Sequence, residues 1–434
     1  MHKLLLEAKK HLDEAEIYFS SSSNTTIGIF EGELDSFEMA ESGGLGLRGL
    51  KGDRMGYSYS ENPSEEGYED LIQGVLESLE IVDEKEDLYD GLGAYEEVEK
   101  KELIKASPDD VIEGLKKLEE LVLKNPGISK VSGAVYQEVE ARTSIENTLG
   151  LKKESSSAVA FVYVMAACQE GQDTHSGIAL RTFWDFSQLD LEALAEDCIE
   201  DCLSRLGARS LESGEYKVLI DKESFNSLSS SFSSVFSAEM VEKKMSLLEG
   251  RLGEKIASSS FSLKMEPLGK DTPMPSQFDG EGYPRSNFYL IKDGVLKSFY
   301  HNRATAKKAG VRSTGNASRS YKGRLGLAPS HLVIEGGERS EKEILSTIKK
   351  GVYIKELQGF HSGLNAVSGD FSLPASGFYV EDGKIIHPIN QVLLSGNYFE
   401  LIDSILELSS DRSERSLSSS SPGVLVDKLS LGGI

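Results

Sequence analysis

Hydrophobic residues recur at intervals of three and four in several stretches of the first half, and this spacing predicts amphipathic helices. The stretches are residues 1–13, "YEDLIQGVLESLEI" from residue 68, "DDVIEGLKKLEELVLK" from residue 109, and the acidic "LDLEALAEDCIEDCLSRL" that follows Trp184. Asp109 stands at the start of the third stretch. We expect it to cap that helix, because an aspartate at this position can accept a backbone N–H hydrogen bond.

Between these helices the pattern changes to β-prone runs. Residues 16–60 contain short runs interrupted by turn residues, and Gly52-Asp53 is typical of a hairpin turn. "SKVSGAVYQEVEARTSIEN" and "SSSAVAFVYVMAACQE", residues 129–147 and 155–170, have the composition of longer strands. The first half is therefore predicted to consist of helices packed on an antiparallel sheet.

The second half begins after a small, polar, turn-prone segment, "GARSLESGEY" at residues 207–216. A strand, "YKVLI", follows, and two hairpins are expected with turns at residues 292–294 and 381–383, each ending in Asp-Gly. Helical patterns recur in "SEKEILSTIKK" and "NYFELIDSILEL". The predicted fold is α+β with two domains: residues 1–210, and residues 211–434, a mostly antiparallel β domain with flanking helices.

One predicted helix of the second half is unusual because serines fill most of its polar positions. Residues 224–244, "SFNSLSSSFSSVFSAEMVEKK", have apolar residues at helical spacing and no histidine. The apolar positions are Phe225, Leu228, Phe232, Val235, Phe236 and Met240. Serine is a poor helix former, so the composition needs a reason other than helix stability.

The net charge bears on possible partners. The chain has 434 residues and a formal net charge of −24, with a pI near 4.8. Such a chain repels phosphate backbones, so we expect no direct binding to nucleic acid. No apolar segment approaches eighteen residues and the N-terminus does not resemble a signal peptide, so no membrane association is expected.

The cysteine content indicates a reducing compartment. Three cysteines in a chain of this length argue against a disulfide framework, and we expect a cytoplasmic protein. Cys198 and Cys202 are four residues apart on a predicted helix and share a face. Because no other metal ligand is near them in sequence, packing is preferred over a redox or metal pair.

No catalytic motif is complete in the sequence. There is no G-x-S-x-G, and the S-x-x-K formed by Ser346 and Lys349 lies in a charged helical pattern without its companion motifs. No two of the seven histidines lie within eight residues, so a local histidine pair for zinc does not exist. A scattered metal site of His361, Asp370 and His387 stays open as a minor alternative.

Two stretches of the second half carry a family resemblance. Residues 278–317, "FDGEGYPRSNFYLIKDGVLKSFYHNRATAKKAGVRSTGNA", and residues 351–402 resemble the signature of the TldD/PmbA family, known as modulators of DNA gyrase and as metallopeptidase subunits. The C-terminal "GVLVDKLSLGG" and the N-terminal "GGLGLRGLKGDRMGYSYS" are similar to the same family. The most specific matches are residues 313–316, Ser-Thr-Gly-Asn, and residues 369–372, Gly-Asp-Phe-Ser.

The resemblance implies which branch of the family this chain belongs to. TldD-like subunits carry H-E-x-x-x-H on a helix and a cysteine near the C-terminus, which together bind the metal. Here the serine-rich helix and the C-terminal "SLSSSSPGVLV" stand in those places, so the chain resembles the PmbA (TldE) branch. By this resemblance it has no catalytic residue and no metal ligand, and zinc is expected only in a TldD-like partner.

The resemblance also implies a function and a substrate-binding segment. The chain would be a subunit of a metallopeptidase that degrades or processes unfolded peptides, would form part of the substrate chamber, and would be inactive alone. Gly369, Asp370, Phe371 and Ser372 are the candidate substrate-binding residues. From the residues themselves, Asp370 is rather expected to accept main-chain N–H bonds in a turn, so both readings stay open.

Two classes of function remain possible from sequence. The first is the peptidase subunit, paired with a TldD-like chain as a heterodimer or with itself as a homodimer when isolated. Obligate pairing of this kind predicts an interface of roughly 2,000 Å² or more. The second is a non-enzymatic binding or modulator protein, related to gyrase or to a toxin–antitoxin pair, that acts as a homodimer.

Overall fold

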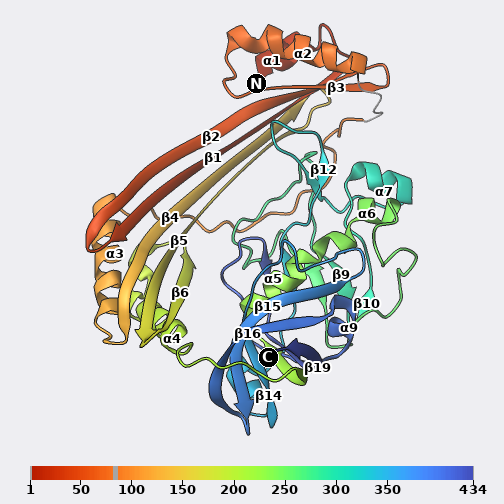
Figure 1. The fold of residues 1–434 in the computed structure, drawn as a ribbon. Helices are drawn as coiled ribbons and strands as arrows, with labels where there is room; N and C mark the ends of the chain where they lie inside the picture. The colour runs from red at the N-terminus through yellow and green to blue at the C-terminus, as the bar shows by residue number, and fades with distance from the viewer. Residues whose placement is uncertain (1, 82–86, 434) are drawn as a thin grey trace.

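The computed structural model, which describes residues 2–81 and 87–433, confirms the α+β fold and is dominated by one long antiparallel sheet (Figure 1). Its strand order is β3-β2-β1-β4-β5-β6. The strands are β1 (Glu14–Phe30), β2 (Glu33–Lys51), β3 (Arg54–Ser60), β4 (Ile128–Asn147), β5 (Lys152–Glu170) and β6 (Asp173–Phe183). Four of them have 17 to 20 residues, well above the usual strand length.

The prediction of short strands in residues 16–60 is wrong, although the turn at Gly52-Asp53 is confirmed. β1 lies between β2 and β4 and is paired with both along nearly its whole length, from Glu14 to Phe30 with β2. Ladder hydrogen bonds on both sides satisfy the backbone through the middle of β1, which is rich in serine and threonine. This pairing outweighs the low strand propensity of those residues.

Helices cover one face of the sheet at its two ends. α1 (His2–Ala8) and α2 (Tyr68–Ile81) pack at one end, and α3 (Pro108–Leu123) and α4 (Leu191–Leu203) pack at the other (Figure 1). The odd-numbered side chains of β1, such as Ile17 and Ile27, belong to these helix-covered cores. We call this the outer face. The span of α2 matches the prediction. The predicted cap of α3 is wrong, because Ser107 and not Asp109 caps this helix, by accepting from the N–H of Asp110.

The opposite, inner face of the long sheet is directed at the C-terminal half. Tyr18 on β1 packs there with Ile145 and Leu151, and Phe278 of the C-terminal half completes the same core. An ion pair crosses this contact, since Arg319 Nη1 lies 2.6 Å from Glu16 Oε1 and both side chains are fully buried. The two halves of the chain are therefore held together by an apolar and an ionic contact.

The C-terminal half contains two further sheets, which confirm the expected mostly antiparallel β arrangement. One has the order β16-β15-β14-β7-β19-β17, and an additional pairing of β16 with β19 closes it into a ring. Its strands are β7 (Gly214–Ile220), β14 (Lys350–Leu357), β15 (Asp370–Glu381), β16 (Lys384–Asn397), β17 (Ile405–Leu408) and β19 (Val424–Gly432). Both predicted hairpin turns are confirmed, with Asp293-Gly294 and Asp382-Gly383 at positive φ.

The other sheet has the order β10-β9-β8-β13-β18, with helices and a short strand pair around it. Its strands are β8 (Leu263–Met265), β9 (Phe288–Lys292), β10 (Val295–Leu296), β13 (Leu332–Ile334) and β18 (Ser419–Ser420), and the separate pair is β11 (Ala317–Ser318) with β12 (Gly326–Leu327). Helices α7 (Arg303–Ala309) and α8 (Glu341–Leu345) lie outside both sheets. Within the described residues, no helix is long and apolar enough to cross a membrane.

The serine-rich segment is not one helix, as predicted, but three short pieces. α5 (Lys222–Ser231) is followed by a 3-10 turn (Ser233–Phe236) and by α6 (Ala238–Glu242). The hydroxyls of Ser227 and Ser231 donate to the carbonyls four residues earlier, a contact that weakens and bends helices. The apolar positions Phe225, Leu228 and Phe232 are nevertheless fully buried, so the predicted core face is confirmed.

The predicted helix at residues 397–408 is correct only in its first half. α9 (Tyr398–Asp403) is helical, but Ile405–Leu408 forms β17 and pairs with β19. Pairing with β19 satisfies the backbone of this apolar segment as a strand, and periodicity alone cannot separate this outcome from a further helical turn.

Candidate functional site

The start of α5 is fixed by a buried polar cluster of Asp221, Glu341, Tyr353 and Lys355, which we call the α5 cluster. Asp221 caps the helix by accepting from the N–H of Glu223 at 2.9 Å. The same carboxylate accepts from Lys355 Nζ at 2.6 Å, and its Oδ2 atom lies 3.2 Å from the Tyr353 hydroxyl oxygen. These contacts tie α5 to β14, the strand that carries both Tyr353 and Lys355.

Glu341 is the second carboxyl group of the α5 cluster. One of its oxygens accepts from the N–H of Lys222 at 2.8 Å, and the other accepts from the Tyr353 hydroxyl at 2.7 Å. Burial and the neighbouring Asp221 raise the pKa of Glu341 to about 7. The cluster therefore stores a proton near neutral pH, since two close buried carboxylates resist simultaneous ionisation.

The end of α5 lies against the serine run at residues 416–421. The hydroxyls of Ser230 and Ser419 are 3.0 Å apart, and Ser419 is also 3.0 Å from Ser416. Ser419 is buried, so these hydroxyls satisfy one another inside the protein. The structure thus brings together the two serine-rich segments that lie almost two hundred residues apart in sequence.

The donors at this contact do not fit a zinc ion. Zinc is bound by cysteine, histidine and carboxylate side chains, whereas the groups that meet between α5 and residues 416–421 are serine hydroxyls. In the part of the chain that the structure describes, no group of three or more His, Cys, Asp or Glu residues is placed to hold a metal. We therefore derive no metal chemistry from these residues.

The cysteines lie in the core between α4 and the long sheet, and they behave as packing residues. Cys168 Sγ donates to the carbonyl of Cys202 at 3.1 Å, and Cys198 Sγ donates to the carbonyl of Val164 at 3.4 Å. Burial raises the pKa of the Cys198 thiol to about 12 and also raises the pKa of the Cys202 thiol. These thiols stay protonated at neutral pH, so the packing interpretation is confirmed.

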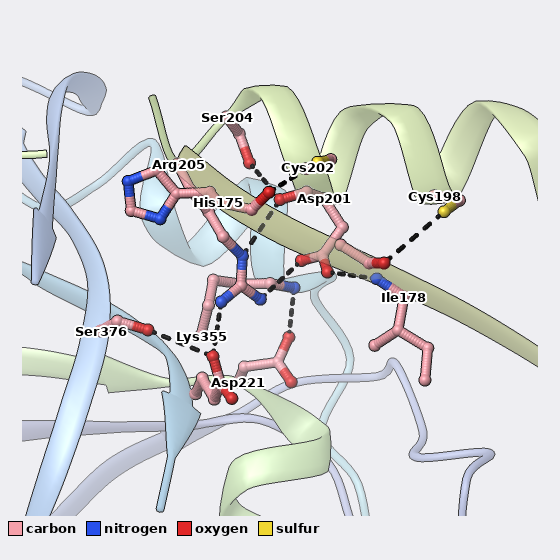
Figure 2. Close-up of polar contacts among 12 residues, drawn as sticks. His175, Ile178, Cys198, Asp201, Cys202, Ser204, Arg205, Asp221, Lys355 and Ser376 are labelled. Atoms are coloured by element: carbon pink, nitrogen blue, oxygen red, sulfur yellow. Dashed lines mark hydrogen bonds and ion pairs between the residues drawn. The ribbon is translucent and has the colours of Figure 1, made fainter. Parts of the chain in front are cut away.

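A second polar contact joins α4 to the C-terminal half close to the α5 cluster (Figure 2). Arg205 pairs with Asp201 at 2.9 Å and with Glu356 on β14, and Asp201 also accepts from the N–H of Ile178 at 3.0 Å. Figure 2 shows the Lys355–Asp221 pair beside this contact. A cavity of about 600 Å³, which we call the junction cavity, is lined here by residues that include His175, Arg205, Glu356, Pro374 and Ser376.

The candidate substrate-binding run Gly369–Ser372 lies at the start of β15, beside the junction cavity. Asp370 and Ser372 are exposed on one face of the strand, whereas Phe371 is buried in the core. That face continues through Pro374 and Ser376, which line the junction cavity. The run is thus placed where a bound chain could reach it, and its role in substrate binding stays a prediction.

Asp370 has a structural contact that differs from the expected one. Its carboxylate accepts from the side-chain amide of Asn397 at 2.9 Å rather than from main-chain N–H groups, and this hydrogen bond lowers the pKa of Asp370. Asn397 also caps α9 and donates to the carbonyl of Ser368. Sequence could not have found this partner, because the two residues are 27 positions apart in sequence and meet only when β15 pairs with β16.

Replacing Gly369 with alanine is expected to destabilise the protein by at least about 1 kcal/mol more than replacing Gly310. Both glycines have positive φ, +83° and +67°, which costs alanine about 1–2 kcal/mol in each case. A methyl group at Gly369 would lie 3.0 Å from atoms of Asn397 and Phe399, whereas nothing lies within 4 Å at Gly310. Denaturant unfolding of both variants measures the difference, and equal losses would show that the loop absorbs the methyl group.

The alternative metal site of His361, Asp370 and His387 is wrong. His387 pairs with Tyr379, nine residues along β15 from Asp370, a separation of about 30 Å for an extended strand. His387 stacks on the Tyr379 ring with centroids 5.4 Å apart. The imidazole of His387 and the carboxylate of Asp370 therefore cannot bind the same metal ion.

The middle of the inner face was missed by sequence reasoning. The even-numbered positions of β1 between Tyr18 and Gly28 are Ser20, Ser22, Asn24 and Thr26, all of them half-buried. Thr143 on β4 is opposite Ser20 in the ladder. This surface is small, polar and rich in hydroxyls, and the alternation was present in "FSSSSNTT", but a serine run carries no hydrophobic signal to show which face is covered.

Comparison with known proteins matches nearly the whole chain to one family. The PmbA/TldA metallopeptidase models match as domain 1 over residues 15–81, as the central domain over residues 101–209 and as the C-terminal domain over residues 213–433. The metalloprotease PmbA of Escherichia coli O157:H7 is 24% identical over 93% of this chain and 89% of its own length. An uncharacterised protein of Methanocaldococcus jannaschii is 26% identical over 94% of both chains.

Solved structures show the same fold. A Thermotoga maritima protein, named for a suggested role as a modulator of a DNA gyrase, superposes with a TM-score of 0.91 at 30% identity, covering 99% of each chain. TldE from Thermococcus kodakarensis superposes with a TM-score of 0.89 at 24% identity, covering 100% of each chain. The latter comparison supports the fold alone.

Proposed function

Because this chain belongs to the PmbA/TldA metallopeptidase family, we propose that it is the PmbA-like, non-catalytic subunit of a two-subunit peptidase that acts on unfolded peptides. The zinc ion and its ligands would be contributed by a TldD-like partner. This chain would supply part of the surface along which the peptide lies.

One observation carries the proposal: the contact between α5 and residues 416–421. The family resemblance assigns the metal ligands of the catalytic branch to a helix and a C-terminal segment in these places. Here the two segments meet through the hydroxyls of Ser230 and Ser419 at 3.0 Å, and neither segment has a histidine or cysteine. This contact supports the proposal, because small polar side chains stand where the resemblance would place zinc ligands in the catalytic branch.

The inner face of the long sheet is suited to the proposed role as a chamber wall. Its half-buried middle carries Ser20, Ser22 and Thr143, short side chains that let a peptide approach the sheet and offer hydroxyls for hydrogen bonds. Such a surface holds many peptide sequences because it does not select for one side chain. Binding that relies on main-chain groups has the same tolerance.

We further propose that the isolated chain forms a homodimer and exchanges to a heterodimer when a TldD-like chain is added. Large exposed apolar side chains at the tip of the β1–β2 hairpin support an interface, since Leu34, Phe37 and Met39 are 46%, 49% and 72% exposed. A two-fold contact needs only one self-complementary surface. Light scattering of the isolated chain, followed by titration with the partner, measures both states.

The direct test compares the purified chain with its complex. Alone, the chain is expected to retain no stoichiometric zinc after dialysis and to leave unfolded peptides intact, because its donors do not fit zinc. Mixed with a homologue from the same genome that carries H-E-x-x-x-H, it is expected to give zinc-dependent, chelator-sensitive hydrolysis. Metal analysis and a peptide-cleavage assay are the measurements.

Two results would contradict the proposed function. Near-equimolar zinc together with chelator-sensitive hydrolysis by the chain alone would make this chain catalytic. A chain that neither binds the H-E-x-x-x-H homologue nor changes its activity would favour the modulator alternative, in which a homodimer binds a gyrase-related or toxin–antitoxin partner.

A further inference from the structure

A second cavity, of about 220 Å³, lies between the inner face of the long sheet and the C-terminal half. Its sheet side is formed by hydroxyl-bearing residues that include Tyr18, Thr143, Ser155 and Ser157. The opposite side comes from residues 276–285 and 317–329, part of the stretch in which the family resemblance is strong. We call it the arginine cavity, because Arg285 and Arg319 both line it.

Arg285 has an unused guanidinium group in this cavity. The residue is half-buried, and within residues 2–81 and 87–433 its side chain makes no hydrogen bond and no ion pair; its Nε atom is buried without a partner. Asp279 lines the same cavity but accepts from the N–H groups of Glu281, Tyr283 and Ala317 instead. An N–H donor that is shielded from solvent and has no acceptor is costly, so the buried Nε of Arg285 favours an anionic ligand.

A second arginine of the arginine cavity also has unused hydrogen-bond donors. Arg319 pairs with Glu16 through Nη1, and its Nε and Nη2 atoms have no acceptor among the described residues. Arg48 also contacts Glu16, at 3.3 Å. Besides Arg285 Nε, the arginine cavity therefore has two buried nitrogen donors on Arg319 that no acceptor in the described part of the chain satisfies, while the nearby Glu281 contacts Arg303.

We propose that the arginine cavity binds a carboxylate group of the peptide substrate, with Arg285 as its charged partner. A planar guanidinium can hold a carboxylate through two parallel hydrogen bonds, and the hydroxyls of Ser155 and Thr143 can add further ones. The proposal rests on the proposed peptide-binding function and adds a preference to it.

The position of the arginine cavity relates it to α5. Pro329 lines the cavity, and Leu332, three residues later, pairs with Ser419 of β18. Three residues of extended chain span at most about 10 Å. Since Ser419 contacts Ser230 of α5, the arginine cavity and the contact between α5 and residues 416–421 are close enough for one short peptide to reach both.

The test is a binding cycle on the full chain with fluorescently labelled hexapeptides of alanine and serine. One peptide ends in a free carboxylate, the second is amidated at its C-terminus, and the third is amidated but contains one glutamate. Amidating the C-terminus of the peptide is expected to weaken its binding at least tenfold, which is the usual effect of losing a charge-assisted hydrogen bond. The Arg285→Gln substitution is expected to weaken binding of the free-carboxylate peptide by the same factor. In the Arg285→Gln variant, amidation should cause no further loss. Arg251→Gln, at an exposed site paired with Glu254, is the matched control and should bind as the wild type does.

The third peptide separates the two sources of a carboxylate, the chain end and an acidic side chain.

A second variant keeps the test usable even if Arg285→Gln fails to fold. Ser155→Ala removes a hydroxyl of the arginine cavity without changing its charge, and is expected to weaken binding of the free-carboxylate peptide about threefold. The proposal is overturned if the wild-type chain binds charged and amidated peptides equally, if Arg285→Gln leaves binding unchanged, or if no peptide binds. Since hydrolysis by the complex is measured separately, such results leave the proposed subunit role standing.

Discussion

Replacing Glu16 with alanine is expected to lower the free energy of unfolding by about 3–5 kcal/mol. The Glu16 carboxylate is fully buried and lies 2.6 Å from Arg319 Nη1 and 3.3 Å from Arg48 Nε. Without it, the buried guanidinium group of Arg319 loses its counter-charge in a region of low dielectric, and Arg48 loses one contact. Most of the loss comes from the charges left unpaired and not from the attraction removed.

The same variant tests how the two halves of the chain are held together. Glu16 is on β1 and Arg319 belongs to the C-terminal half, so the loss should be accompanied by earlier unfolding of the contact between them. Denaturant unfolding gives the free energy, and the matched control is Glu254→Ala, which breaks the exposed pair with Arg251 and should cost no more than about 1 kcal/mol. Equal effects of the two variants would show that water reaches the Glu16 site.

The second large effect concerns pH. The pKa of Glu341 is raised from its ordinary value of 4.5 to about 7, chiefly by burial and then by Asp221. A group with a raised pKa binds its proton more tightly in the folded protein, so its contribution to stability is complete below about pH 4.5 and is lost as pH rises through about 7. A shift of one pKa unit corresponds to about 1.4 kcal/mol. Between about pH 4.5 and pH 7 the wild type should therefore lose about 3 kcal/mol of its free energy of unfolding through Glu341.

Glu341→Gln removes the titrating group and keeps the shape of the side chain. Between pH 5 and pH 8.5 this variant is expected to lose about 3 kcal/mol less stability than the wild type, and so to be relatively more stable at alkaline pH. The groups facing Glu341 are Asp221, Tyr353, Lys355 and Asp411, all unchanged in the variant. Measuring the free energy of unfolding of both proteins at several pH values shows how steeply the stability of each falls with pH.

The control for the pH experiment is Glu338→Gln, an exposed glutamate in the loop before α8. Its pH profile should follow that of the wild type. Parallel profiles for Glu341→Gln and the wild type would mean that Glu341 is ionised in the folded protein, so the two carboxylates of the α5 cluster would have to be neutralised by Lys355 alone.

Much of the local structure was predictable, because it depends on neighbours in sequence. The apolar spacing in residues 68–81 predicted α2 with its observed bounds. The Asp-Gly pairs at 293–294 and 382–383 predicted two hairpins, since only such residues readily adopt positive φ at adjacent turn positions. The absence of a local histidine pair and the family resemblance in residues 278–317 led to the PmbA-like assignment of the chain.

Segments with weak local preferences were decided by their partners. β1 continues through its serines because β2 and β4 pair with it on both sides, and Ile405–Leu408 becomes a strand because β19 offers an edge. α5 ends at Ser231, where serine hydroxyls compete for the helix carbonyls. In each case, the difference between helix, strand and turn is small for the isolated segment and is outweighed by tertiary hydrogen bonds.

The sequence by itself determined the family, the turns, the main helices and the lack of a local metal motif, because these depend on residue identity and short spacing. Only the tertiary structure decided which distant polar groups meet. Asp221 reaches Glu341 and Lys355 across more than one hundred residues, and Arg285 is left facing hydroxyls of β4 and β5. The physical reason is that burial, which raises the pKa of Glu341 and deprives Arg285 of water, is a property of packing and not of any one segment of the chain.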